Sequence, residues 1–169
     1  MMMVIDPAGN PQIVANLDGC AGWTVAADPL PADYFDRPYR IENGVLVPDL
    51  AAARARQRAM INAGRDAAQD GGADTPSGRF DSASRSREFL NGAVVAAQIA
   101  LAQGQPFSIN WTLANNNVVT LDAAGIIAAG LAVAAHVDAM HSRARVLKSR
   151  IDAATTLAGI AAITWTVED

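Results

Sequence analysis

The stretch AAGIIAAGLAVAAHVDAMHSRARVLKSRIDA, residues 123–153, decides the fold of this chain. Its apolar residues recur at alternating spacings of four and three, a heptad pattern that places them along one face of a single long helix. Asp122 stands just before the stretch and is a typical N-cap residue. A helix of roughly thirty residues would be about 45 Å long. The residues of this heptad seam are Ile126, Gly130, Val133, Val137, Met140, Ala144, Leu147 and Ile151.

A helix of that length can extend beyond the core of its own domain, so part of the seam is expected to contact another protein chain. This interpretation predicts a partner-binding surface, with a second copy of the chain as one candidate partner. The residues assigned to it are Val133, Val137, Met140, Ala144, Leu147 and Ile151.

The same helix carries both histidines and a group of basic side chains. His136 and His141 are five residues apart, which separates them by about 140° around the helix axis, so they do not form a pair of metal ligands. The cations are expected to surround the last turns, where they complement the negative end of the helix dipole. We expect no metal site and no nucleic-acid surface, while an acidic partner surface stays open. These cations are Arg143, Arg145, Lys148 and Arg150.

The remaining sequence predicts an α+β fold in two domains. Residues 1–48 contain short alternating segments broken by Pro, Gly and Asn, typical of a small β module or adaptor. Asn43-Gly44 predicts a tight hairpin turn, and residues 28–38 predict an extended linker. Residues 49–169 predict a domain of three main helices with a β-hairpin.

The first helix of that domain is expected from Asp49, as N-cap, to about residue 69, and the second from Ser82 or Ser84 to Gly104. Alternation over residues 107–121 predicts the hairpin, and a short helix and an edge strand are expected at the end of the chain. The apolar stripe of the first helix is Leu50, Ala53, Met60, Ile61, Gly64 and Ala67, and that of the second is Leu90, Val94, Ala97 and Leu101.

Composition restricts the function further. The net charge is −4, which disfavours a duplex-binding surface, and Cys20 is the only cysteine, so no intramolecular disulfide forms. The longest apolar run, residues 123–135, is shorter than the about 20 residues that cross a bilayer, and the first residues lack the pattern of a signal peptide. We therefore expect that the chain has no membrane partner and is located in a reducing cytoplasm.

No reactive motif stands out. The chain has no nucleophile elbow, phosphate-binding loop or zinc-protease motif, and we expect no catalytic residue and no cofactor. Arg79, Arg85 and Arg87 surround a helix N-terminus that would attract an anion, although a capped helix start explains them as well. Phe107, Trp111 and Trp165 suggest a sugar platform, but at strand spacing beside apolar neighbours they are more typical of a core.

Four segments together resemble an uncharacterised domain family at the C-terminal end of bacteriophage tail and tail-fibre-associated proteins. The segments are ARQRAMINAGRDAA, GRFDSASRSREFLNGAV, GQPFSINWTLANNNVVTLDAAGI and GLAVAAHVDAMHSRARVLKSRIDAATTLAGIAAITW. In addition, the passage ENGVLVPDLAAARAR is similar to tail-fibre assembly proteins of tailed phages. The family supplies no catalytic residue to carry over.

The resemblance implies a non-enzymatic phage tail protein, located in the virion tail and in the host cytoplasm during assembly. Its partner would be a tail-fibre or baseplate protein. An alternative is a tail-fibre assembly chaperone that is not retained in the virion. A further alternative is a protein that binds or cleaves cell-wall or other sugars, which would need paired carboxylates beside a groove.

Overall fold

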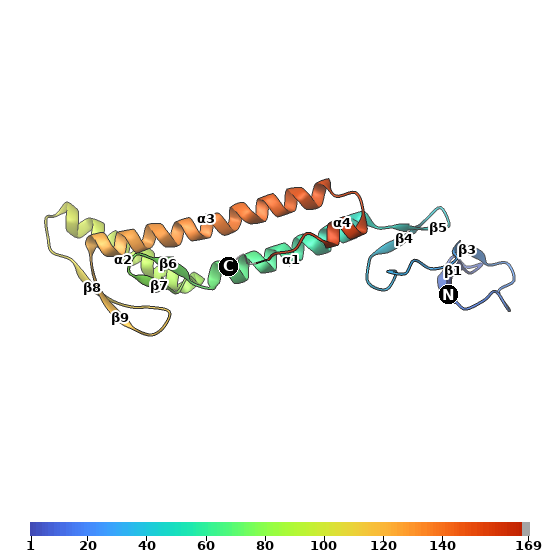
Figure 1. Ribbon diagram of the computed structural model, residues 1–169, viewed down its shortest axis with the longest axis horizontal. Helices are drawn as coiled ribbons and strands as arrows, with labels where there is room; N and C mark the ends of the chain where they lie inside the picture. Colours follow the sequence, from blue (N-terminus) through green and yellow to red (C-terminus); the bar gives the residue numbers. More distant parts are fainter. Residues whose placement is uncertain (167–169) are drawn as a thin grey trace. The chain divides into compact units, whose positions relative to one another are not determined.

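The computed structural model describes residues 1–166 and has the α+β fold that the sequence predicts (Figure 1). The helices are α1 (Leu50–Asp70), α2 (Ser84–Ala102), α3 (Ala123–Ala153) and α4 (Leu157–Ala161). The strands are β1 (Met2–Ile5), β2 (Pro11–Val14), β3 (Thr24–Ala27), β4 (Tyr39–Glu42), β5 (Val45–Pro48), β6 (Ala73–Thr75), β7 (Gly78–Phe80), β8 (Ser108–Thr112) and β9 (Val118–Asp122). They form one three-stranded sheet in the order β2-β1-β3 and three hairpins.

Packing divides the chain into two compact units. The first unit contains residues 1–59 and 149–164, and the second contains residues 60–148 together with the segment that begins at Trp165. The boundary passes through α1 and α3 instead of falling between residues 48 and 49. The prediction that residues 1–48 form an independent module stays a prediction.

The β4–β5 hairpin in the first unit confirms the predicted turn. Glu42 pairs with Val45, and the two residues between them, Asn43 and Gly44, have φ values of 50° and 80°. Both positive values are what a type I′ turn requires, and asparagine and glycine adopt them at the lowest steric cost.

The expectation of an extended linker over residues 28–38 is wrong. This segment folds into turns, in which the N–H of Tyr34 donates to the carbonyl of Pro31 and the N–H of Arg37 to that of Asp33. The Asp33 carboxylate accepts a 2.7 Å hydrogen bond from the Tyr39 hydroxyl and pairs with Arg37 at 3.1 Å. Local polar contacts therefore outweigh the preference of its prolines for an extended chain.

Helices α1 and α3 are joined by polar contacts in the first unit. Asp49 caps α1 as predicted, because its Oδ1 accepts a 2.9 Å bond from the N–H of Ala52. The Arg58 guanidinium pairs with the Asp152 carboxylate, and Gln57 donates at 2.6 Å to the Ile163 carbonyl. The predicted short helix is also confirmed, since the Thr156 hydroxyl caps α4.

The inward stripe of α1 differs from the prediction at three residues. Met60 and Ala67 are exposed, whereas Gln57 is buried together with Ala53 and Ile61. A spacing of four between these three residues keeps them on one face. Gln57 was missed because a polar side chain was not expected inside, yet its amide finds a backbone acceptor.

The core of the second unit forms around α2 and α3. Phe80 of β7 is fully buried, as is Ile126 of α3, and the β8–β9 hairpin covers the same cluster with Leu113 and Leu121. The inward face of α2 is rich in alanine, which keeps neighbouring backbones close. The buried members of the cluster are Ala73, Phe80, Leu90, Ala93, Ala97, Leu113, Leu121, Ala123, Ile126, Ala129 and Val133.

The β8–β9 hairpin confirms the predicted alternation. Ser108, Asn110 and Thr112 are exposed, while the residues between them face the core. At the tip, Asn116 has a φ of 65°, the left-handed conformation that asparagine tolerates. The hairpin leads directly into α3, where Oδ1 of Asp122 caps the helix through a 2.8 Å bond from the N–H of Gly125.

The start of α2 does not use the predicted serine cap. Ala83 occupies the N-cap position without a side-chain bond. Ser82 is instead fully buried, where its hydroxyl accepts from the N–H of Gly72 at 2.9 Å and donates to the carbonyl of Gln69 at 2.6 Å. The end of α2 follows the prediction, because Gly104 has a φ of 65°. Its stripe stops earlier than predicted, since Leu101 is exposed.

The end of the chain returns to α1 within the second unit. A Cβ atom added at Gly64 would overlap the Trp165 side chain, so glycine at this position provides the space for the indole. The predicted edge strand is not formed at Thr164–Thr166, and the rest of it, residues 167–169, lies outside the described residues.

We expect Phe80→Ala to lower the free energy of unfolding by about 3–5 kcal/mol, because the side chain is fully buried and its loss leaves a cavity. Phe89→Ala is the matched control, since that ring is 61% exposed. Chemical denaturation followed by circular dichroism measures both variants. Equal losses in the two variants would contradict this description of the core.

Gly130→Ala tests the close approach of α3 to α2. The new Cβ would lie 2.7 Å from Cγ2 of Val94, and a β-branched side chain in a helix cannot easily rotate away. We expect a net loss of about 1–2 kcal/mol, the cost of overpacking less the gain in helix propensity. In a Val94→Ala background the same change should be neutral or stabilising. A double-mutant cycle, with free energies of unfolding measured by chemical denaturation, tests this contact. Purely additive effects of the two substitutions would contradict it.

Candidate functional site

The predicted partner-binding seam lies largely inside the chain. Val133, Ala144, Leu147 and Ile151 are buried, and Val137 and Met140 are half-buried. The heptad pattern therefore correctly identified the inward face of α3. Little of the four buried residues is accessible to another chain in this structure, so the partner-binding role stays a prediction.

The two histidines of α3 lie beside the end of α1. Nε2 of His136 is 3.1 Å from the carbonyl oxygen of Ala68. The Gln69 amide satisfies all its neighbours when its Nε2 donates to Nε2 of His141 at 3.1 Å and its Oε1 accepts from Arg87 at 3.0–3.1 Å. Each histidine thus has its own partner. Within residues 1–166, no three His, Cys, Asp or Glu side chains gather as metal ligands.

Two of the four basic side chains near the end of α3, those of Arg143 and Arg145, make contacts within the chain. The guanidinium of Arg143 lies 5.1 Å from the centre of the Trp165 ring, and Arg145 is 3.8 Å from the Asp138 carboxylate. The first contact is a cation–π interaction, and the second is an exposed pair that contributes little.

The three arginines near the start of α2 also have partners. Arg79 pairs with Asp74 at 3.0 Å and Arg87 with Asp70 at 2.9 Å, while the Arg85 guanidinium lies 5.6 Å from the centre of the Phe89 ring. These partners all lie within the chain, but the capped helix start offered as the alternative explanation is not formed, because the N-cap residue Ala83 makes no side-chain hydrogen bond.

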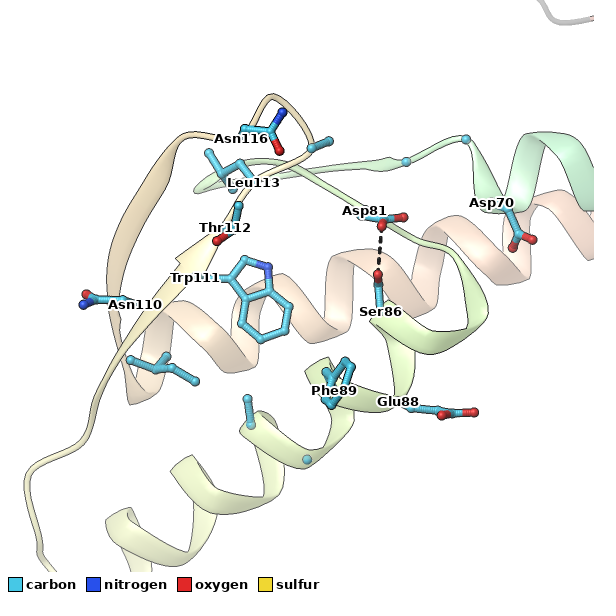
Figure 2. Close-up of a pocket in the computed structure, with 16 residues that line it drawn as sticks. Asp70, Asp81, Ser86, Glu88, Phe89, Asn110, Trp111, Thr112, Leu113 and Asn116 are labelled. Atoms are coloured by element: carbon cyan, nitrogen blue, oxygen red, sulfur yellow. Dashed lines mark hydrogen bonds between the residues drawn. The ribbon is translucent and has the colours of Figure 1, made fainter.

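The second unit contains a groove of about 890 Å³ between β8 and the first turns of α2, which we call the edge groove. Figure 2 shows Trp111 projecting from β8 toward Phe89 of α2. The Trp111 ring stacks on Phe80, with ring centres 5.5 Å apart, so its position is fixed by the core. The groove is lined by Asp70, Gly71, Gly72, Asp81, Ser86, Glu88, Phe89, Gly92, Ala93, Asn116 and the run from Ile109 to Ala114.

The ionisable side chains that line the groove are all carboxylates: Asp70, Asp81 and Glu88. Oδ1 of Asp81 accepts a 2.9 Å bond from the N–H of Ala83, and its Oδ2 accepts a 2.8 Å bond from the Ser86 hydroxyl (Figure 2). These bonds hold the pKa of Asp81 below its ordinary value of 3.8, with the backbone bond as the larger cause. A general acid of a glycosidase needs a raised pKa, so Asp81 is poorly suited to that role.

The outer face of α2 carries exposed apolar side chains. Val95 and Ile99, four residues apart on one face, are each 53% exposed. Sequence reasoning missed this face because it sought the one stripe that packs inward. The signal was present in the sequence, since α2 has more large apolar residues than one stripe holds. Exposed apolar area of this kind marks surfaces that contact other molecules.

Helix α3 is long enough and apolar enough to cross a membrane. Core helices of water-soluble proteins can meet the same criteria of length and composition. The run considered in the sequence, residues 123–135, is only part of this helix. Ile126, Ala129 and Val133 of this helix belong to the core of the second unit. That no membrane is a partner stays a prediction.

A family model described as "Domain of unknown function (DUF4376)" matches residues 52–164, which is more than half of the chain. The matched region begins in the first turn of α1 and ends after α4, so it includes the edge groove and the outer face of α2. No curated protein and no solved structure matches the chain significantly.

The Asp81 contacts give a test by pH titration. We expect an Asp81 pKa below 3.8 in the folded chain and a higher value in Ser86→Ala, because that variant removes one bond to the carboxylate. A lowered pKa stabilises the fold above the unfolded value, and this contribution disappears as the pH falls through the folded pKa. Carboxyl-carbon NMR measures both values. An unchanged pKa in Ser86→Ala, with Ser77→Ala as the control, would contradict the contact.

Proposed function

For this chain, which belongs to the family of the domain of unknown function DUF4376, we propose a non-enzymatic role as a bacteriophage tail protein that works through protein–protein contacts. The phage part of the proposal rests on the resemblance of residues 50–165 to domains of tail and tail-fibre-associated proteins. In this proposal the chain is a structural or attachment component beside the tail fibre or baseplate. It is located in the virion tail, and in the host cytoplasm during assembly.

The observation that supports protein contacts is the apolar surface that α2 leaves uncovered in the second unit. Val95 and Ile99, which share one face of the helix, are each more than half exposed, as is Phe89, which lines the edge groove. Apolar groups on a surface gain free energy when a partner removes them from water, at about 25 cal/mol per Å². A partner surface on α2 differs from the seam predicted on α3.

The two forms of the proposal differ in whether the chain remains in the finished particle. A virion component needs a contact that survives assembly, whereas an assembly chaperone releases its partner. The third alternative, a sugar-binding or sugar-cleaving protein, gains some support from Trp111 and the groove carboxylates. It is disfavoured as an enzyme by the lowered pKa of Asp81.

Quantitative mass spectrometry of purified phage particles, and of the lysate from which they come, tests the proposal. For a virion component we expect the chain at a fixed copy number relative to the fibre and baseplate proteins. Presence in the lysate with absence from the particles would favour the chaperone. A chain that neither enters particles nor co-purifies with any tail protein from the infected cell would contradict both forms.

A further inference from the structure

We propose that the edge groove binds an extended peptide segment of a partner protein, which adds as a third strand to the free edge of β8. The inference deepens the proposed function, because it names the surface and the kind of partner. It rests on that proposal in one respect, that protein contacts are the role of this chain. The segment would carry apolar side chains at alternate positions and basic side chains between them.

The groove is bordered by the edge of a strand. Every residue from Ile109 to Ala114 lines it, although successive side chains of a strand point to opposite faces. A continuous run of lining residues therefore indicates that the backbone edge, and not one face, borders the groove. β9 pairs with the opposite edge of β8.

The hydrogen-bonding pattern identifies the free groups on that edge. The N–H of Leu113 donates to the carbonyl of Asn117 across the hairpin, at 2.8 Å. In an antiparallel pair, alternate residues bond to the partner strand, so Trp111 and Ile109 do so as well. Asn110 and Thr112 then direct their N–H and C=O groups away from β9. Among residues 1–166, no hydrogen bond occupies these backbone groups of Asn110 and Thr112. The next outward-facing donor, the N–H of Ala114, bonds to the Arg79 carbonyl at 2.9 Å, so the free edge ends at Thr112.

The wall opposite β8 is apolar and has space. Phe89, Gly92 and Ala93 supply it from α2, and Trp111 projects from β8 between the two walls (Figure 2). A Cβ atom added at Gly92 would contact nothing within 4 Å, so the groove is open at that point. A groove between a free strand edge and a helix favours strand addition, with backbone bonds for affinity and pockets for alternate side chains.

Charge indicates the chemistry of the segment. The lining has three carboxylates and no Lys or Arg. Arg87 neutralises Asp70, and Arg85 lies on the ring of Phe89 without lining the groove, whereas Glu88 forms no ion pair with another described residue. A basic segment should therefore bind in the groove more tightly than an acidic one. A second copy of this chain that presented the same groove would place the carboxylates of the two copies against each other, which makes that pairing a poorer occupant.

The size of the groove agrees with a short peptide. The free edge of β8 that borders the groove runs from Ile109 to Thr112, which is about 10 Å of extended strand. The volume of about 890 Å³ is within the range of ligand-binding pockets in proteins and leaves room for side chains beside the added strand.

The experiment uses the full-length chain and a synthetic array of octapeptides. Each peptide has Val, Ile, Leu, Phe or Tyr at alternate positions and either lysine or glutamate between them. The best lysine peptide is then labelled and titrated by fluorescence anisotropy. We expect its glutamate twin to bind at least tenfold more weakly.

Two further probes separate strand addition from simple apolar binding. One peptide is N-methylated at its apolar residues and another at its lysines, so that each lacks the N–H donors of one edge. We expect one isomer to lose at least tenfold in affinity and the other to lose much less. Equal binding of both isomers and the parent peptide would overturn strand addition.

Variants locate the binding in the groove. Gly92→Leu places a side chain in the groove, and leucine is a good helix former, so the variant should fold but bind the peptide at least tenfold more weakly. Asn91→Leu changes an exposed neighbour that does not line the groove and should leave peptide binding unchanged. Circular dichroism verifies that both variants fold. Peptide binding that survives Gly92→Leu, an array without any bound peptide, or preference for an oligosaccharide that the peptide cannot displace would each overturn the inference.

The test is separable from that of the proposed function. If the chain is present in particles but binds no peptide of the array, only the strand-addition inference fails. If the groove binds lysine peptides but the chain neither enters particles nor co-purifies with tail proteins, the tail role fails and the groove assignment stands.

Discussion

Burial of Phe80 against small apolar residues of α2 and α3 is the contact on which the second unit depends. Phe80 lies at the end of β7, and its ring is covered by Trp111 from β8 and by the alanine-rich face of α2. Because α2 presents Ala93 and Ala97 instead of large side chains, the neighbouring helices approach closely enough to exclude water. The aromatic pair also fixes the hairpin, so the position of the edge groove follows from the same contact.

Polar contacts complete this arrangement where the backbone turns. Ser82 satisfies a donor at Gly72 and an acceptor at Gln69, both just beside the end of α1. Arg87 connects the same corner to Asp70 and, through the Gln69 amide, to His141 of α3. Buried polar groups are costly unless bonded, so such a network favours one arrangement of the turn over others. Both histidines of α3 contact this corner, His136 at the Ala68 carbonyl and His141 at the Gln69 amide.

Elements with a strong local signal could be predicted from the sequence. The heptad spacing of α3, the Asn43-Gly44 turn and the alternation in β8 all follow from local geometry, and the structure confirms them. What was missed depends on contacts between distant residues. Gln57 is buried because Ile163 supplies an acceptor, and Ser82 leaves its cap position because the end of α1 needs its hydroxyl. The edge groove lies between β8 and α2, and no local sequence pattern indicates which strand edge is left unpaired.

The first unit is discontinuous along the chain, and this affects the order in which contacts can form. Its two parts, residues 1–59 and 149–164, are separated by nearly the whole of the second unit. The pairs that join them, such as Arg58 with Asp152, close loops of more than ninety residues, which is entropically costly in an unfolded chain. During synthesis on the ribosome, most of the second unit emerges before residue 149. Prior folding of that unit would shorten the remaining loop and let α1 and α3 extend their pairing toward the ends of the chain.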